Sequence, residues 1–242
     1  MSSLGQFLEF SVPAPDLGAS LDFYLRLGFS EVRVNDIRPR GYAAVTDGQI
    51  VIGLHASGLD KPALAFVRPD LARHARALVD AGTELEFQRL DNDQFNEVGL
   101  QTPDGQLLVL LEAPTFSVPE DDHPAPVIGR CTEVTLGNVA SDETREFFEL
   151  AGFLATDGDD DDAVLLSAPG LSLALRVAPR CGDIGLRFEP TGQWREPLDH
   201  RGIPGRPAGR DYVLIAPEGT RLLLVLAVKT RRNPQTCGLI RD

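Results

Sequence analysis

Hydrophobic and polar positions alternate over residues 7–14, which places Glu9 on one face of a predicted strand and leaves the other face apolar. The pattern then changes to a helical period. Asp16 is suited to cap the start of that helix, and Gly28 stands where a terminal glycine is expected. Three strand-like segments follow, at 30–35, 42–46 and 49–55. These residues therefore predict a β-α-β-β-β module.

The same order of elements is predicted three more times along the chain. The second module has a strand, a helix and three further strands, at 63–67, 70–81, 84–89, 96–101 and 106–112. A third module runs from about 131 to 177 and a fourth from 183 to 228. The predicted fold class is therefore α+β, with four β-α-β-β-β modules arranged as two pairs.

An internal repeat supports this organisation. The segment LDFYLRLGF at 21–29 returns as REFFELAGF at 145–153. Carried back along the chain, the same alignment places Glu9 over Glu133, near the start of two equivalent strands. Two acids at one position of a repeat form a pseudo-symmetric pair, and the search for a site begins with them.

Proline and glycine indicate where the domains should end. Four prolines mark 114–128 as a linker, which predicts an N-terminal domain at 1–113, a C-terminal domain at 129–230 and a tail at 231–242. The helix expected at 191–201 contains Pro197, which is unfavourable within a helix. The fourth module is therefore the least regular.

Composition narrows the classes of function. The net charge of −13 disfavours nucleic acid as a partner, because phosphate binding needs a concentrated cationic surface. The chain lacks both a long apolar run and a signal-like start, so we expect a cytoplasmic protein with no membrane partner. Three widely spaced cysteines indicate reduced thiols. The acidic run at 157–162 lacks the EF-hand pattern and is interpreted as a solvated loop.

The motif from Val12 to Phe29, with a Pro-Asp-Gly turn at 103–105 before an apolar last strand, resembles the vicinal oxygen chelate superfamily. This superfamily includes glyoxalase I, extradiol dioxygenases, fosfomycin-modifying enzymes and bleomycin-resistance proteins. The resemblance covers nearly the whole chain and implies that the modules pair into two half-open barrel clefts. It leaves open whether module 1 pairs with 2 and 3 with 4, or 1 with 4 and 2 with 3.

In enzymes of this superfamily a divalent metal is held by the first and last strands of the modules. The equivalent first-strand positions here are Glu9, Ala63, Glu133 and Asp183. The last-strand positions, counted from the turn glycines, are Ile52, Val109, Ala174 and Leu223. No histidine occurs in the first set and no ligand in the second, so we expect no metal and no other cofactor. Strand parity directs His55 away from Glu9, and His74 is assigned to an exposed helix face.

Glu9 and Glu133 would then lie on apolar barrel walls, and three interpretations remain open. The acids could act as general acid or base, or as counter-charges for a cationic ligand. They could also be structural carboxylates paired with an arginine such as Arg40 or Arg176. The predicted ligand-binding residues are Glu9, Tyr42, Ile52, Phe95, Val109, Glu133, Arg176 and Asp183.

The function predicted from these features is metal-independent binding of a small molecule, as in bleomycin-resistance proteins. The ligand would be mostly apolar, with or without a cationic group, and the protein a monomer or homodimer. A first alternative is a lyase, isomerase or cyclase that uses Glu9 or Glu133 as acid or base. A second is a metal-dependent glyoxalase or dioxygenase with non-standard ligands, and a third is a relative whose clefts are filled and whose role is structural.

Overall fold

The computed structural model describes residues 4–32, 41–90, 96–113, 123–137, 142–156, 163–176, 184–190, 192–209 and 211–225. Two residues of the predicted site, Phe95 and Asp183, lie outside these ranges, as do Arg40, the acidic run and the tail.

The first two modules share one sheet of eight strands. Its elements are β1 (Gln6–Pro13), α1 (Leu17–Leu27), β2 (Ser30–Glu31), β3 (Tyr42–Thr46), β4 (Val51–His55), β5 (Ala63–Arg68), α2 (Leu71–Asp80), β6 (Leu85–Arg89), β7 (Glu97–Gln101) and β8 (Leu107–Glu112). The strand order is β2-β3-β4-β1-β5-β8-β7-β6. The first strands of the two modules, β1 and β5, lie antiparallel at the centre, and each pairs in parallel with the last strand of its own module.

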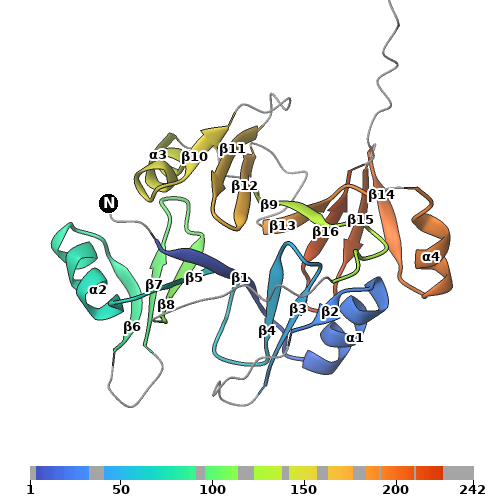
Figure 1. Cartoon of the computed structure of the whole chain (residues 1–242), viewed down its shortest axis with the longest axis horizontal. Helices are drawn as coiled ribbons and strands as arrows, with labels where there is room; N and C mark the ends of the chain where they lie inside the picture. Colours follow the sequence, from blue (N-terminus) through green and yellow to red (C-terminus); the bar gives the residue numbers. More distant parts are fainter. Residues whose placement is uncertain are drawn as a thin grey trace, which may run out of the picture.

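Modules 3 and 4 form a second sheet of the same kind. Its elements are β9 (Cys131–Gly137), α3 (Asp142–Leu150), β10 (Leu154–Thr156), β11 (Ala163–Ala168), β12 (Leu171–Arg176), β13 (Ile184–Phe188), α4 (Arg195–His200), β14 (Gly205–Ala208), β15 (Asp211–Ile215) and β16 (Arg221–Leu224). The order β10-β11-β12-β9-β13-β16-β15-β14 repeats that of the first sheet (Figure 1). The α+β fold of four modules is confirmed, and within each sheet module 1 pairs with 2 and 3 with 4.

Local signals in the sequence account for the helix ends. The Asp16 carboxylate accepts a hydrogen bond from the backbone N–H of Ala19 at 3.0 Å, and Gly28 ends α1 in the left-handed conformation with φ of 98°. The helix at 195–200 is shorter than expected. Pro197 lies in its first turn, where a missing backbone N–H removes no intrahelical hydrogen bond.

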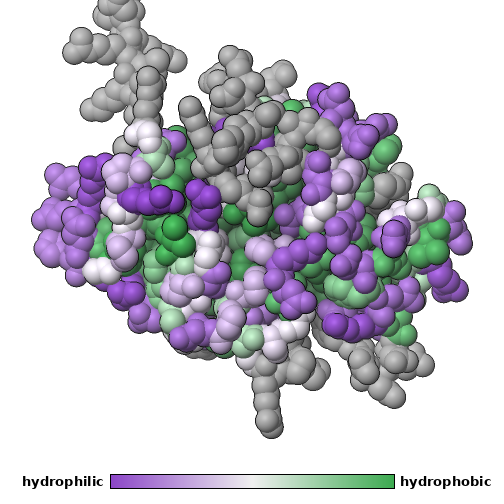
Figure 2. All heavy atoms as spheres, turned by 180° about the vertical axis from the view of Figure 1, so that it is seen from behind, coloured by the Kyte–Doolittle hydropathy of each residue, from purple (hydrophilic) through white to green (hydrophobic). Residues whose placement is uncertain are grey.

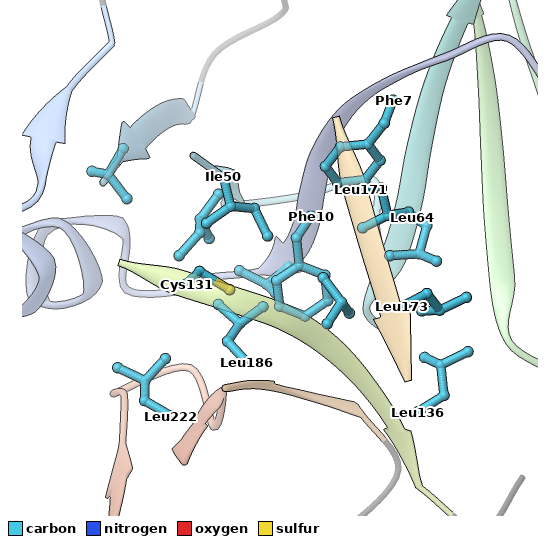
Figure 3. Close-up of a cluster of buried hydrophobic side chains, with 14 of the residues drawn as sticks. Phe7, Phe10, Ile50, Leu64, Cys131, Leu136, Leu171, Leu173, Leu186 and Leu222 are labelled. Carbon is cyan, nitrogen blue, oxygen red and sulfur yellow. The ribbon is translucent and has the colours of Figure 1, made fainter. Parts of the chain in front are cut away.

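The main hydrophobic core lies between the two sheets and draws on both. In Figure 3, Phe10 and Ile50 of the first half point toward Leu186 and Leu173 of the second. Edge-to-face ring contacts also cross between the halves, including Phe66 with Phe153 at 6.4 Å and Phe29 with Phe188 at 6.2 Å. The two halves therefore share one core.

The opposite face of the first sheet carries a second, smaller apolar cluster. Its buried members alternate along β5 and β8: Ala63, Ala65, Val67, Leu107, Val109 and Leu111. Glu9 pairs with Ala65 across β1 and β5, so its side chain lies on this face. We call this the Glu9 face.

A β-bulge changes the expected alternation at the start of β1. The register shifts between Phe7 and Glu9, which leaves Leu8 as the extra residue. Phe7 consequently packs in the main core against Phe66, with ring centroids 5.7 Å apart, while Leu8 packs against the smaller cluster. Strict alternation over residues 7–14 would place Phe7 on the same face as Glu9, and the bulge moves it to the opposite face.

Polar contacts also join the two halves. The buried Asp47 carboxylate, in the turn between β3 and β4, accepts hydrogen bonds from the backbone N–H groups of Gln49 and Ile50, each at 2.8 Å, and from that of Cys131. Arg130 donates to the Asp47 carbonyl at 2.6 Å.

On the face shown in Figure 2, polar and apolar residues are interspersed. None of the described helices has the length and apolar character needed to cross a membrane.

Candidate functional site

Glu9 is the most deeply buried acid of the predicted site, with 1% of the residue exposed. Its carboxylate accepts a hydrogen bond from Ser11 Oγ at 2.7 Å and another from the Tyr42 hydroxyl. His55 Nε2 lies 3.1 Å from Glu9 Oε1. The expected isolated acid is thus the centre of a polar group that we call the Glu9 cluster, formed by Glu9, Ser11, Tyr42 and His55.

The register of β4 explains why His55 reaches Glu9. Phe10 aligns with Ile52 and Ser11 with Gly53, and a Cβ atom added to Gly53 would lie 2.2 Å from Glu9 Oε1. The last-strand neighbour of the Glu9 carboxylate is therefore Gly53. His55 follows two positions later and faces the same side of the sheet. The expectation that His55 points away from Glu9 is wrong, because the carboxylate lies against Gly53, two positions before His55, and not against Ile52.

The structure brings only part of the predicted first-half set together. Tyr42 contacts Glu9 directly, and Val109 lies on the Glu9 face within the smaller apolar cluster. Ile52 is fully buried in the main core and does not contribute to the Glu9 face. Ser11 and His55 belong to the site but were not in the predicted set.

Glu133 has a different environment in the second half. Its Oε1 atom lies 2.7 Å from Arg176 Nη2 and 3.2 Å from Arg187 Nη1, with Thr135 Oγ1 at 3.5 Å. The side chain of Glu133 is 11% exposed. Pairing with Arg176 agrees with the structural interpretation of this acid, and Arg187 is a second cationic partner that was not expected.

The two acids nevertheless occupy equivalent positions in their sheets. Glu9 pairs with Ala65 across the central strands, whereas Glu133 pairs with Arg187. His55 ends β4 and Arg176 ends β12. The repeat has therefore kept the acid and changed its neighbours.

The neighbours change the electrostatics of each carboxylate. Ser11 and Tyr42 donate hydrogen bonds from neutral hydroxyl groups to Glu9, and such donors stabilise the charged form of a carboxylate. Glu133 contacts two guanidinium groups. Because this site is partly buried, removing the charge of Glu133, Arg176 or Arg187 would make the remaining charges costly to keep there.

The donor atoms do not fit a divalent metal of the type that the resemblance implies. In the first half the relevant positions are Glu9, Gly53, Ala65 and Val109. In the second half they are Glu133, Ala174, Arg187 and Leu223. In the first half the Glu9 carboxylate has the His55 imidazole beside it as a second possible donor, short of the three ligands that such sites use. In the second half a guanidinium stands beside the one carboxylate, where a metal ion would be repelled. Over the described ranges, no three His, Cys, Asp or Glu side chains are grouped as metal ligands.

A pocket of about 280 Å³ lies where the halves meet, lined in part by Gln49, Ile50, Cys131, Glu133, Leu171 and Ser172. Burial, together with the nearby Asp47 carboxylate, raises the pKa of the Cys131 thiol well above its usual value. Because the thiolate is the reactive form, this environment disfavours Cys131 as a nucleophile. The Glu9 cluster does not line this pocket.

His74 differs from its predicted position. It lies on the buried face of α2 with Leu71, Ala75 and Leu78, at the spacing of an amphipathic helix, and only 5% of it is exposed. Burial and the neighbouring Arg68 lower its pKa to about 4. The expectation of an exposed His74 is wrong, and the residue remains neutral at physiological pH.

No protein-family model matches the sequence, and no curated protein matches it. Solved structures do resemble it. A catechol 2,3-dioxygenase aligns with a TM-score of 0.61 and 18% identity over 94% of this chain and 89% of its own. Homoprotocatechuate 2,3-dioxygenase from Brevibacterium fuscum gives 0.64 and 16% over 96% and 75%.

A third similar structure is the Mn(II)-bound glyoxalase from Novosphingobium aromaticivorans, with a TM-score of 0.59 and 16% identity over 93% of this chain and 83% of its own. At such identities the likeness shows a shared fold, and activity has to be argued from the site itself. The dioxygenases and the glyoxalase are members of the vicinal oxygen chelate superfamily. This chain therefore has the fold of the vicinal oxygen chelate superfamily, built from four β-α-β-β-β modules in two sheets.

Proposed function

We propose that the protein binds a small molecule at the Glu9 face and does so without a metal. The observation that carries this proposal is the Glu9 cluster: a carboxylate with 1% exposure, held by polar partners on a face that is otherwise apolar. A charged group on an apolar face costs free energy. Groups retained at such a cost are concentrated at functional sites.

Tyr42 and His55 are the members of the cluster that reach the surface. Tyr42 is partly exposed, and the side chain of His55 is 20% exposed, against 2% for that of Glu9. A ligand would therefore touch these two rings, and Glu9 would act on it through them. Apolar groups of the ligand would lie against partly exposed side chains that pack on the smaller cluster, such as Leu59.

The proposed roles of the two acids differ. Glu133 is held by Arg176 and Arg187, so we assign it to the stability of the second sheet, where it joins β9, β12 and β13. An acid–base enzyme remains the second candidate function, because a carboxylate beside an imidazole is an arrangement that supports proton transfer. A metal-dependent activity receives less support from the donor atoms.

The proposal can be tested by magnetic resonance on protein with isotope-labelled histidines, in buffer containing EDTA. Neutral and cationic aromatic probes, including 2-naphthol and benzyltrimethylammonium, would be titrated in. We expect the His55 ring signals, assigned by substitution, to shift with saturation while those of the exposed His200 stay in place. If no probe shifts the His55 signals, or if shifts appear only after Fe²⁺, Mn²⁺ or Zn²⁺ is added, the proposal is wrong.

A further inference from the structure

We propose that the Glu9 face selects ligands that carry a hydrogen-bond donor, a hydroxyl or ammonium group, because His55 presents a hydrogen-bond acceptor to them. This inference rests on the proposed binding site and adds the chemical class of the ligand. It follows from the charge of Glu9, the tautomer of His55 and the exposure of the imidazole ring.

Glu9 acts as a hydrogen-bond acceptor in the cluster. Ser11 and Tyr42 both direct hydroxyl groups at its carboxylate, and their hydrogen bonds stabilise the ionised form. An ionised carboxylate has only acceptor atoms. The contact of 3.1 Å between Glu9 Oε1 and His55 Nε2 therefore requires the proton to be on Nε2.

The other ring nitrogen of His55, Nδ1, is the atom that a ligand would meet. A neutral imidazole that carries its proton on Nε2 has a lone pair on Nδ1 and can accept a hydrogen bond there. Within the described part of the chain, the hydrogen bond to Glu9 is the only one that the ring makes. The edge contact with the Tyr42 ring, at 4.9 Å between centroids, holds the imidazole in place. In the neutral ring Nδ1 is thus the acceptor offered to a ligand, whereas a doubly protonated ring would offer none.

The second half of the chain differs at this position. The residue at the equivalent strand end is Arg176, whose guanidinium has donors and no acceptor. The repeat therefore supplies a substitution that the fold already accommodates. His55→Arg would place beside Glu9 the kind of side chain that Glu133 already binds, and it would remove the acceptor.

The experiment compares 2-naphthol with 2-methoxynaphthalene, which has nearly the same apolar surface but lacks the donor. Dissociation constants would be measured by fluorescence titration for the wild type, His55→Arg and His55→Gln. One additional hydrogen bond should make 2-naphthol bind about tenfold more tightly to the wild type. His55→Arg should bind the two probes equally, and His55→Gln, whose amide oxygen can accept, should retain part of the preference.

The tautomer is read separately from the ¹⁵N shifts of His55, which require no ligand. A protonated Nε2 and an unprotonated Nδ1 support the inference, and either the reverse assignment or a ring protonated on both nitrogens at neutral pH overturns it. Equal affinity of the wild type for both probes overturns the inference but leaves the proposed binding function in place. If neither probe binds at the Glu9 face, the binding function and the inference fail together.

Discussion

Glu9 and Glu133 show how one duplicated residue can have two environments. In the first half the acid meets hydroxyl groups and an imidazole, and in the second it meets two arginines. The alternation of hydrophobic and polar residues predicted that each acid would point away from the main core. It could not predict the partners, because Arg187 lies on a different strand and is brought to Glu133 only by the register.

The arginine pair predicts a stability effect at Glu133. Glu133→Gln removes the carboxylate charge that the partly buried guanidinium groups of Arg176 and Arg187 both contact, so we expect the free energy of unfolding to fall by about 3 kcal/mol. Urea denaturation would measure the loss. Glu9→Gln is the matched variant, and a smaller loss is expected there because the glutamine oxygen can still accept hydrogen bonds from Ser11 and Tyr42. An equal or larger loss for Glu9→Gln would contradict the assignment.

His74 predicts a pH dependence of stability. Its pKa is lowered from 6.5 in the unfolded chain to about 4 in the folded protein. Between these values the unfolded chain binds more protons, so the free energy of unfolding should decrease as the pH falls from 6.5 toward 4. His74→Leu should reduce this slope, whereas the exposed His200→Gln should not. Unfolding at a series of pH values would check this, and an unchanged slope in His74→Leu would refute it.

At the scale of elements, the sequence pattern located most helices and strands but not their register. The cap at Asp16 and the terminal Gly28 have local causes, so they could be read from the sequence. The bulge at Leu8 depends on pairing between distant strands. The alignment that brings Gly53 to Glu9 also depends on pairing between distant strands. For this reason the sequence did not predict the contact between His55 and Glu9.

Gly53 gives a test of this register. In Gly53→Ala the added methyl group would lie where the Glu9 carboxylate is, and we expect a loss of about 2 kcal/mol from overpacking, together with a displaced His55 ring. Gly18→Ala, in the exposed part of α1, is the control and should be neutral or stabilising. Thermal unfolding would compare them. A fully stable Gly53→Ala with an unmoved His55 signal would argue against the described register.

At the scale of the molecule, the repeat predicted four modules, and both sheets have that form. The shared core between the sheets was not predicted, since the proline-rich segment indicated two separate domains. Contacts such as that from the Tyr24 hydroxyl to Glu218 Oε1, at 2.7 Å, join segments far apart in the sequence. Periodicity within one module contains no information about such contacts.

The Tyr24 contact predicts coupling between the halves. Burial and the Glu218 carboxylate raise the pKa of Tyr24 well above its usual value, so the hydroxyl remains a donor at neutral pH. Tyr24→Phe leaves Glu218 without this donor and should cost about 1 to 2 kcal/mol. Adding Glu218→Gln should recover part of that loss. A double-mutant cycle by denaturation measures the coupling, and strictly additive losses would show that none exists.

The central claim is that a metal-independent ligand site is built on Glu9 and that its repeat partner Glu133 is structural. The most direct test is the dissociation constant of 2-naphthol in EDTA for the wild type, Glu9→Gln and Glu133→Gln, measured in parallel where all three variants are folded. Glu9→Gln replaces the carboxylate that orients the His55 ring, so we predict that it weakens binding of 2-naphthol about tenfold. Glu133→Gln should leave the dissociation constant unchanged. Binding that is lost in EDTA, or weakened only by Glu133→Gln, would contradict the account.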